Sequence, residues 1–179
     1  VTQNIASANA LFFVYDLTQD VQFRRFLIRQ GRELAEQDSR AQLPVLHEMA
    51  SRLRHLRSLG HSEKTEQPLI VVLSKCDTWI DRSQAPTVTP WATSHGASTL
   101  DLAEIVRVSR DLRQKLTEAA PEFIGAVDSI STQVFFVPIS AVGWDCRAEL
   151  TGSRARYSVD PDRIQPFWAE VPFLLALRL

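Results

Sequence analysis

The chain has 179 residues, of which 45% are hydrophobic and 23% charged, so it has the composition of a globular protein that buries one sizeable core. The formal net charge of −1 excludes a strongly basic surface for nucleic acid or anionic lipid. Two cysteines, Cys76 and Cys146, exclude a disulfide framework and a cysteine-rich zinc site, and no run of 18 apolar residues is present, so we expect a cytoplasmic protein without a membrane span or metal ligands of its own.

The first half of the chain alternates apolar runs with amphipathic segments. Residues 10–16 (ALFFVYD) and 69–74 (LIVVLS) are continuous apolar runs, which predict strands buried on both faces. Between them we expect one helix capped by Asp20 and a second helix that ends near Gly60. The expected core positions follow the helical period: Phe23, Phe26, Leu27 and Leu34 in the first helix, and Leu46, Met49, Ala50, Leu53 and Leu56 in the second.

The second half continues this alternation with two insertions. A loop rich in Pro, Ser and Thr (81–98) leads to STLD (98–101), which resembles a capping box at the start of a helix. Pro121 is expected to begin another helix, and 134–140 (VFFVPIS) is the third apolar strand. A polar, irregular insertion (144–162) precedes a short apolar helix, VPFLLALRL. The expected core positions are Leu102, Ile105, Val106, Leu112 and Leu116, then Phe123, Ile124, Val127 and Ile130.

This order of strands and helices predicts one α/β domain over residues 1–179, a three-layer sandwich with a mainly parallel sheet. Open parallel sheets bind ligands beyond the carboxyl ends of their strands. Two polar motifs follow strands in this sequence, SKCD at 74–77 and SAVG at 140–143. We therefore expect both motifs at the same edge of the sheet.

The residue types of these motifs suit the recognition of guanine. The carboxylate of Asp77 can accept hydrogen bonds from both donors on one edge of guanine, whereas adenine presents an acceptor there. A site built on such bonds can reject the wrong base by roughly 10⁴-fold. The alkyl stem of Lys75 can cover a purine face while its ammonium stays in water. The backbone N–H of Ala141 can donate to the guanine carbonyl, and Ser140 can brace that loop.

With these two motifs in this order, the chain resembles the C-terminal half of the nucleotide-binding domain of Ras-like P-loop GTPases. That family reads guanine with Asn/Thr-Lys-x-Asp after one strand and completes the pocket with Ser-Ala-x after the next. ALFFVYDLT also looks like the strand that follows the family's second switch region. The resemblance implies binding of GTP or GDP within the GTPase domain of a larger cytoplasmic protein, which is a GTP hydrolase. It assigns the nucleotide to Ser74, Lys75, Asp77, Ser140 and Ala141.

Three departures from the family pattern affect this hypothesis. Ser74 stands where the family has Asn or Thr, which reach further across neighbouring loops. The chain contains neither a G-x-x-x-x-G-K-[ST] loop nor an Asp-x-x-Gly switch motif. In the family both precede the strand that begins here at Ala10. The resemblance therefore implies that the ligands of Mg²⁺ and the hydrolytic groups come from polypeptide upstream of Val1, and that this chain has no catalytic residue.

A second hypothesis is a degenerate G domain that keeps the fold and acts as a protein interaction module. The helical face that carries Arg52, Arg54 and Arg57 and the two insertions, 81–98 and 144–162, would then contact a protein partner. In either case we expect a protein partner or the remainder of a larger polypeptide beside this chain.

A third hypothesis is a haloacid-dehalogenase-like phosphatase. FFVYDLT loosely resembles the nucleophile motif of that class, with Asp16 as the nucleophile, Ser74 holding the phosphate and Asp145 binding Mg²⁺. Thr18 stands where that class has a second acid, and Asp77 would have no role in such a site.

Overall fold

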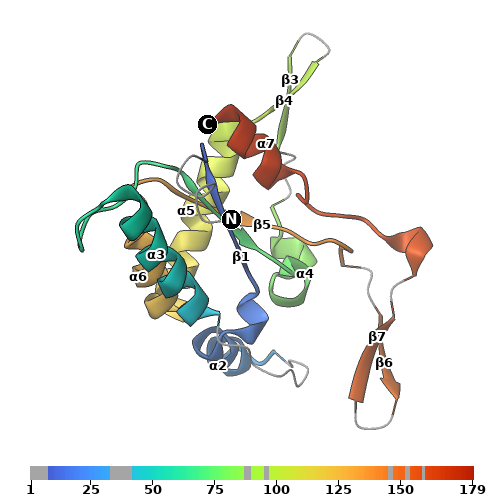
Figure 1. Cartoon of the computed structure of the whole chain (residues 1–179). Coiled ribbons are helices and arrows are strands. Elements are labelled where there is room, and N and C mark those ends of the chain that lie inside the picture. The colour runs from blue at the N-terminus through green and yellow to red at the C-terminus, as the bar shows by residue number, and fades with distance from the viewer. Residues whose placement is uncertain are drawn as a thin grey trace.

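The computed structural model describes residues 8–32, 42–86, 90–94, 97–144, 147–151, 154–158 and 160–179. A parallel sheet lies at its centre (Figure 1). Its strands are β1 (Leu11–Tyr15), β2 (Leu69–Leu73) and β5 (Val134–Pro138), in the order β1-β2-β5. All three apolar runs thus form the strands that the sequence predicts, and the prediction of an α/β fold with a parallel sheet is confirmed.

The three strands differ in how fully they are buried. All five residues of β2 are buried, because β2 is the central strand. In β1 the odd-numbered residues are buried, but Phe12 is 40% and Val14 is 63% exposed. The prediction of burial on both faces is therefore right for β2 and wrong for β1. An apolar run cannot reveal this difference, because the cover of a strand comes from distant parts of the chain.

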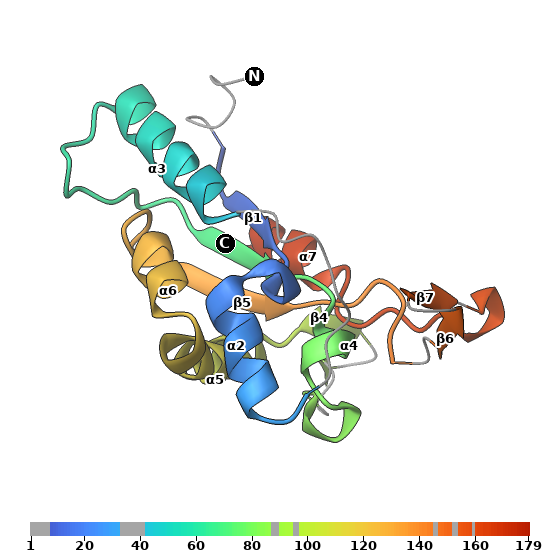
Figure 2. The same ribbon diagram turned by 90° about the horizontal axis from the view of Figure 1, so that it is seen from below.

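Helices lie on both faces of the sheet. Their bounds are α2 (Val21–Arg29), α3 (Leu43–Arg57), α4 (Cys76–Trp79), α5 (Leu102–Ala119), α6 (Pro121–Asp128) and α7 (Val171–Arg178). Helices α5 and α6 lie against one face with α3 beside α6, and α7 lies against the other face (Figure 2). This arrangement is compatible with a three-layer sandwich. In the described part of the chain, no helix combines the length and the hydropathy needed to cross a membrane.

Aromatic contacts join these helices to the sheet. The ring of Tyr15 stacks on Phe123 of α6 with 4.0 Å between centroids, and Phe123 meets Phe136 of β5 edge-on at 6.3 Å. On the opposite face, the rings of Phe12 and Phe173 of α7 lie 5.6 Å apart. Successive residues of β1 therefore point to opposite layers, as the pleat of a strand requires.

Helix α2 begins as the sequence predicts. The carboxylate of Asp20 accepts a hydrogen bond from the backbone N–H of Phe23 at 2.8 Å, which satisfies one unpaired donor of the first turn. Phe23 and Leu27 are buried and Phe26 is partly buried, so the predicted core face is confirmed for these positions. Leu34 lies outside the described residues.

Helix α3 also buries the predicted face but ends differently. Ser58, in the left-handed conformation at φ 52°, caps the helix after Arg57, so the end does not depend on Gly60. Its N–H donates to the carbonyl of His55 at 3.3 Å. Serine at this position is unusual, since glycine adopts this conformation at lower cost. The buried or partly buried positions are Leu46, Met49, Ala50, Leu53 and Leu56, as predicted.

The predicted capping box of α5 lies three residues too early. Residues 97–100 form strand β4 (Ala97–Leu100), which pairs with β3 (Trp91–Ser94) in an antiparallel hairpin. Asp101 is the actual cap, and its carboxylate accepts from the N–H of Glu104 at 3.1 Å. Asp101 and Glu104 have the spacing of a capping box, so the sequence contains the correct motif immediately after the predicted motif, STLD.

Most core positions of α5 and α6 are confirmed, with one exception. Val106 is 39% exposed, and Val108 is buried instead. The remaining predicted positions are buried or partly buried: Leu102, Ile105, Leu112, Leu116, Phe123, Ile124, Val127 and Ile130.

The insertion at 144–162 is not irregular throughout. Strands β6 (Arg147–Thr151) and β7 (Arg154–Ser158) pair as an antiparallel hairpin that extends away from the sheet (Figure 1). These strands pair with each other and not with β1, β2 or β5. Their sequences contain no continuous apolar run, because they do not belong to the buried sheet, and the pattern used to predict strands therefore did not detect them.

The cap of α5 provides a test of this description. Asp101→Ala removes the hydrogen bond to the Glu104 N–H, so we expect the free energy of unfolding to fall by about 1 kcal/mol. Urea denaturation measures this change. Glu118→Ala, at an exposed position of the same helix, is the control and should alter stability by less than about 0.5 kcal/mol. Equal effects of the two substitutions would contradict the capping role.

Candidate functional site

The SKCD and SAVG motifs meet at the carboxyl edge of the sheet. The backbone N–H of Cys76 donates to the carbonyl of Ile139 at 3.0 Å, and the N–H of Ile139 donates to the carbonyl of Leu73 at 2.9 Å. Asp77 directly follows Cys76, and Ser140 directly follows Ile139, so both lie next to this backbone hydrogen bond. The structure therefore brings the backbones of the two motifs together at the position where parallel sheets bind ligands.

Lys75 turns the chain from β2 into α4. Its backbone is left-handed at φ 54°, which is uncommon for a residue with a side chain. The carbonyl of Lys75 accepts two hydrogen bonds from Thr78, from the N–H at 3.0 Å and from the hydroxyl at 2.7 Å. The side chain is 49% exposed, and its Nζ lies 2.8 Å from Oδ2 of Asp16. Lys75 thus links the end of β2 to the end of β1.

The carboxylate of Asp16 is surrounded by donors. Besides Lys75, it accepts from the Thr18 N–H at 2.9 Å, the Thr18 hydroxyl at 2.5 Å and the Gln19 side chain at 3.1 Å. Burial alone raises the pKa of Asp16, but the hydrogen bonds from Lys75 and Thr18 and the charge of Lys75 outweigh it and lower the pKa below its ordinary value. Asp16 therefore caps the 3₁₀ turn Leu17–Gln19 as a fixed anion. These contacts favour a structural role over the nucleophile of a phosphatase.

Ser74 ties β2 to β1. Its N–H and its hydroxyl both donate to the carbonyl of Tyr15, at 2.9 Å and 3.3 Å. The indole of Trp79 donates to the carbonyl of Ser74 at 3.1 Å. Ser74 is thus engaged with its own chain and positions the motif.

Asp77 differs from Asp16 in having an open carboxylate. It lies in the first turn of the short helix α4 and is partly buried. Within the part of the chain that the structure describes, no group donates a hydrogen bond to its carboxylate or forms an ion pair with it. A partly buried carboxylate without a partner is available to a ligand that offers donors.

Ser140 braces the second motif. It is fully buried, and its backbone exchanges two hydrogen bonds with Phe167, at 3.0 Å and 2.8 Å. Its hydroxyl oxygen accepts from the N–H of Gly143 at 2.8 Å and from that of Val142 at 3.3 Å. Ala141, between these anchors, is exposed. The bracing role that the sequence suggests for Ser140 is present in the structure.

Gly143 holds the loop of the SAVG motif close to the C-terminal segment at Gln165. The sequence did not predict this contact. Its φ is +79°, and a Cβ built on it would lie 2.3 Å from the backbone oxygen of Gln165. The N–H of Gln165 donates to the carbonyl of Val142 at 3.2 Å. The glycine that ends SAVG was the available signal, because close approach of two backbones requires a residue without a side chain.

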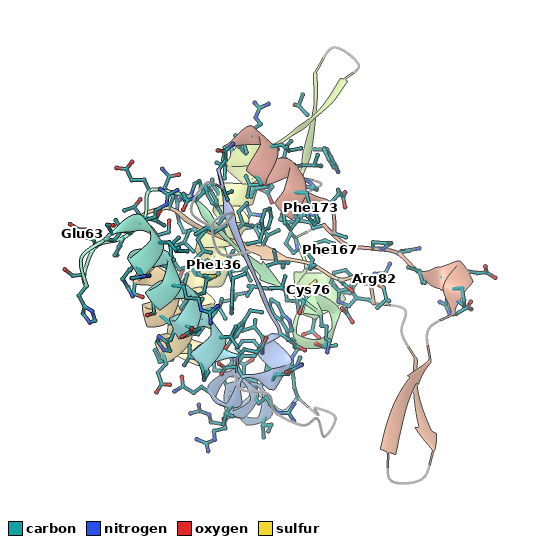
Figure 3. All side chains as sticks on the ribbon, viewed as in Figure 1. Glu63, Cys76, Arg82, Phe136, Phe167 and Phe173 are labelled. Atoms are coloured by element: carbon teal, nitrogen blue, oxygen red, sulfur yellow. The ribbon has the colours of Figure 1, made fainter. Side chains whose placement is uncertain are left out.

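Cys76 is buried beside this edge of the sheet (Figure 3). Burial, and to a lesser extent the charge of Asp77, raise the pKa of its thiol to about 12. The thiol is therefore neutral at physiological pH and unsuited to nucleophilic attack. Cys146, like Asp145, lies outside the described residues.

The resemblance to GTPases implies Mg²⁺, which needs a set of oxygen ligands. Among the residues that the structure describes, no three His, Cys, Asp or Glu side chains gather as a metal site. Mg²⁺ prefers carboxylates, phosphate oxygens and water in octahedral geometry. The described side chains do not provide such a ligand set by themselves.

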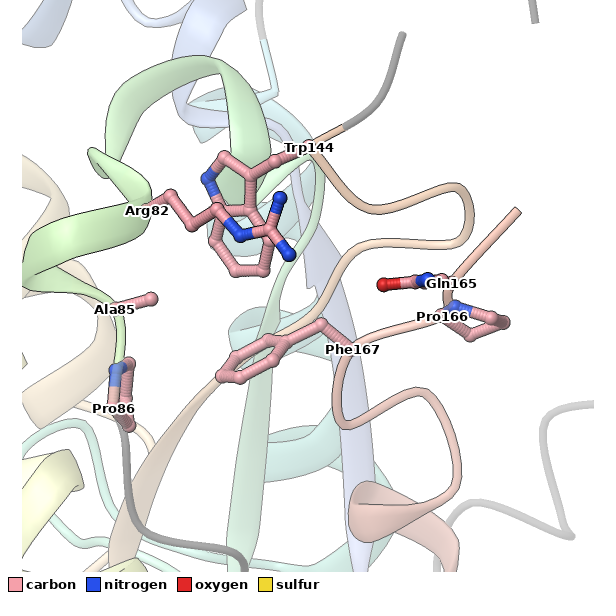
Figure 4. A pocket seen from close by; sticks show the side chains of 7 residues that line it. All are labelled: Arg82, Ala85, Pro86, Trp144, Gln165, Pro166 and Phe167. Carbon is pink, nitrogen blue, oxygen red and sulfur yellow. The ribbon is translucent and has the colours of Figure 1, made fainter. Parts of the chain in front are cut away.

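A cavity of about 250 Å³ lies beside the Ser140 loop (Figure 4). Its walls come from the turn after α4 and from the segments on either side of the β6–β7 hairpin. The lining residues are Arg82, Ala85, Pro86, Trp144, Gln165, Pro166 and Phe167. The SKCD motif does not line this cavity, so the structure separates it from the predicted site residues.

No protein-family model matches this sequence, and neither a curated protein nor a solved structure matches the chain.

The ion pair at the sheet edge predicts a pH-dependent stability. Because the pKa of Asp16 is lowered by folding, its contribution is complete above the ordinary value of 3.8 and is lost as the pH falls through the lowered value. Asp16→Asn should lower the free energy of unfolding by about 1 to 2 kcal/mol at pH 7. The deficit should disappear at strongly acidic pH, as measured by denaturant unfolding across a pH series.

Asp81→Asn is the matched control for this experiment. Asp81 pairs with Arg32 at 2.6 Å, but its side chain is mostly exposed, so its removal should cost less than about 0.5 kcal/mol. A deficit of Asp16→Asn that stays constant from neutral to strongly acidic pH would contradict the assigned ion pair.

The tight approach at Gly143 gives a second test. Gly143→Ala forces a methyl group toward the Gln165 carbonyl at a positive φ, so stability should fall by about 2 kcal/mol or more. Gly125→Ala is the control, because Gly125 lies in α6 with no atom near its missing Cβ and should gain up to about 1 kcal/mol. Thermal or urea unfolding of both variants measures the difference. Equal stabilities would show that the loop tolerates a side chain.

Proposed function

We propose that this domain binds a guanine nucleotide, GDP or GTP, at the carboxyl edge of β2 and β5. The observation that carries the proposal is the partly buried carboxylate of Asp77, which has no partner among the described residues and follows the backbone contact between the two motifs. Guanine offers two adjacent donors on one edge, which a single carboxylate can accept together. The backbone N–H of Ala141, an exposed residue, would donate to the carbonyl of the same base.

The position of Lys75 supports this assignment. Asp16 holds the ammonium at 2.8 Å, while about half of the side chain remains exposed. Anchoring one end of a flexible side chain lowers the entropy lost when a ligand packs on its alkyl stem. Lys75 would therefore cover one face of the base, and Asp16 would act as its positioning residue.

The chain contains no phosphate-binding loop or switch motif, so phosphate binding and hydrolysis would depend on groups outside it. Among the described strands, β1 pairs with β2 alone, so its other edge carries unpaired backbone groups. The exposed side chains of Phe12 and Val14 on β1 are apolar, whereas free edges are usually protected by charges, proline or a covering element. This edge suits an additional strand from the same or another polypeptide. A GTPase domain completed in this way would receive its phosphate-binding loop and its ligands for Mg²⁺ from that polypeptide.

The alternative is an interaction module without nucleotide binding. It is favoured by the two hairpins, β3–β4 and β6–β7, which extend from the body of the domain (Figure 1). Arg54 does not belong to the basic face invoked for this function, because its guanidinium donates to the carbonyl of Ser129 at 2.6 Å. That contact joins α3 to the end of α6.

Base selectivity tests the proposal. A fluorescent GDP should bind the protein about 10⁴-fold more tightly than the corresponding ADP. Asp77→Asn should weaken GDP binding by about 100-fold, because it removes the negative charge and replaces one acceptor with a donor. The same variant should gain affinity for xanthosine diphosphate, whose base has a carbonyl in place of the guanine amino group.

Asp81→Asn, at an exposed position four residues away, is the control and should leave all three affinities unchanged. Equal binding of GDP and ADP by the unsubstituted protein would refute the nucleotide proposal and leave the interaction module as the better hypothesis.

A further inference from the structure

We infer that Trp144 is a positioning residue for base recognition, because its indole ties the loop of the SAVG motif to the turn that carries Asp77. This inference rests on the proposed nucleotide site and assigns a further residue to it. The indole N–H of Trp144 donates to the carbonyl of Ile80 at 3.0 Å. Trp144 directly follows SAVG, and Ile80 directly follows α4, so this bond joins the two motifs at their C-terminal ends.

Two hydrogen bonds enclose the two groups that are proposed to read the base. At the N-terminal ends of the two segments, the N–H of Cys76 donates to the carbonyl of Ile139 at 3.0 Å. At their C-terminal ends lies the indole bond. Asp77 lies on one segment between these two bonds, and Ala141 lies on the other. One bond alone would let the segments rotate about it, whereas two bonds fix their relative orientation.

Each of the two segments is also held internally. The N–H of Ile80 donates to the carbonyl of Cys76 at 2.8 Å, which closes α4 around Asp77. In the other segment, the hydroxyl oxygen of Ser140 accepts from the N–H of Gly143 at 2.8 Å. A bond between the ends of two such segments therefore sets the positions of the groups inside them.

The ring of Trp144 is held in place as well. It meets the ring of Phe167 edge-on, with 5.1 Å between centroids and an interplanar angle of 75° (Figure 4). Phe167 exchanges two backbone hydrogen bonds with Ser140 and stacks on Trp168 at 5.4 Å. The indole donor is thus directed at Ile80 before any ligand binds, and a preorganised site loses less conformational entropy on binding.

The spacing of the two segments matters because guanine is rigid. In the proposed site, the carboxylate of Asp77 accepts from the two donors of the base while the N–H of Ala141 donates to its carbonyl. The bonds to the carboxylate are charge-assisted and are therefore stronger than the neutral bond from Ala141. A base bound between loosened segments would keep the contact to Asp77 and lose the contact to Ala141. The bond from Trp144 therefore supports recognition of the guanine carbonyl.

Trp144→Phe tests this role, because it removes the indole donor and keeps a ring beside Phe167. Displacement of a fluorescent GDP measures the affinities, and the variant should bind GDP about five- to tenfold more weakly. The analogue 6-thio-GDP carries sulfur, a poor acceptor, in place of the carbonyl oxygen. It should bind about tenfold more weakly than GDP to the unsubstituted protein, but only about twofold more weakly than GDP to the variant.

Inosine diphosphate provides the internal comparison. It lacks the amino group that donates to Asp77, so its affinity relative to GDP should be the same in both proteins. Trp91→Phe, the same exchange within β3 and outside both motifs, is the matched control and should change none of these affinities. A general loss of stability would weaken all nucleotides by one factor and leave both ratios unchanged, so the ratios separate a positioning role from a structural one.

A second measurement needs no nucleotide. The indole signal of Trp144 is the one missing from the ¹H–¹⁵N spectrum of Trp144→Phe. In the unsubstituted protein this indole N–H should exchange with deuterium about tenfold or more slowly than a free indole, because it donates to Ile80.

The inference is overturned if the ratio of GDP to 6-thio-GDP affinity is the same in Trp144→Phe and in the unsubstituted protein. Exchange of the Trp144 indole at the rate of a free indole would overturn it as well. Failure of the nucleotide proposal gives a different result, equal binding of GDP and ADP by the unsubstituted protein, and would remove this inference with it.

Discussion

The complete burial of β2 between two parallel neighbours is the constraint on which the rest of the structure depends. A parallel strand cannot connect to its neighbour by a tight turn, so the chain must leave the sheet at the carboxyl end and return through helices. Every strand therefore delivers its following residues to one edge. The polar residues after β2 and β5 meet there, and the backbone hydrogen bond from the N–H of Cys76 to the carbonyl of Ile139 joins the two segments. The left-handed turn at Lys75 is the local consequence of leaving the sheet directly into α4.

The edge assigns different roles to two carboxylates. Asp16 accepts hydrogen bonds from its own turn and pairs with Lys75, so its charge is neutralised within the protein. Asp77 has no such partner among the described residues and is open to a ligand. Both aspartates follow strands of the sheet, so their positions in the sequence are similar. Their surroundings differ: Asp16 is a structural anion, whereas Asp77 is a candidate group for recognising a ligand.

The C-terminal segment is as important to this edge as the two motifs. Phe167 exchanges two backbone hydrogen bonds with Ser140, and the backbone at Gln165 packs against Gly143. The same segment forms part of the wall of the neighbouring cavity. Gln165 and Phe167 therefore contact the SAVG motif through their backbones and also line the cavity.

The amino-acid sequence alone predicts those features that depend on neighbouring residues. It predicted the three strands, the Asp20 cap and, apart from Val106, the described core positions of the helices correctly, because strand runs, caps and helical periods are local signals. It also placed both motifs at strand ends, from which their meeting at one edge followed. The register of the α5 cap was wrong because two overlapping capping patterns compete within residues 98–104.

Long-range packing places β1 at the edge of the described sheet, pairs Lys75 with Asp16 and brings Gly143 close to Gln165. The cavity belongs to the same group, since its walls come from three separate segments of the chain, around Arg82, Trp144 and Phe167. Each of these features depends on residues far apart in the chain whose proximity is set by the crossovers of the sheet. A short stretch of sequence carries no information about which distant segment will pack against it.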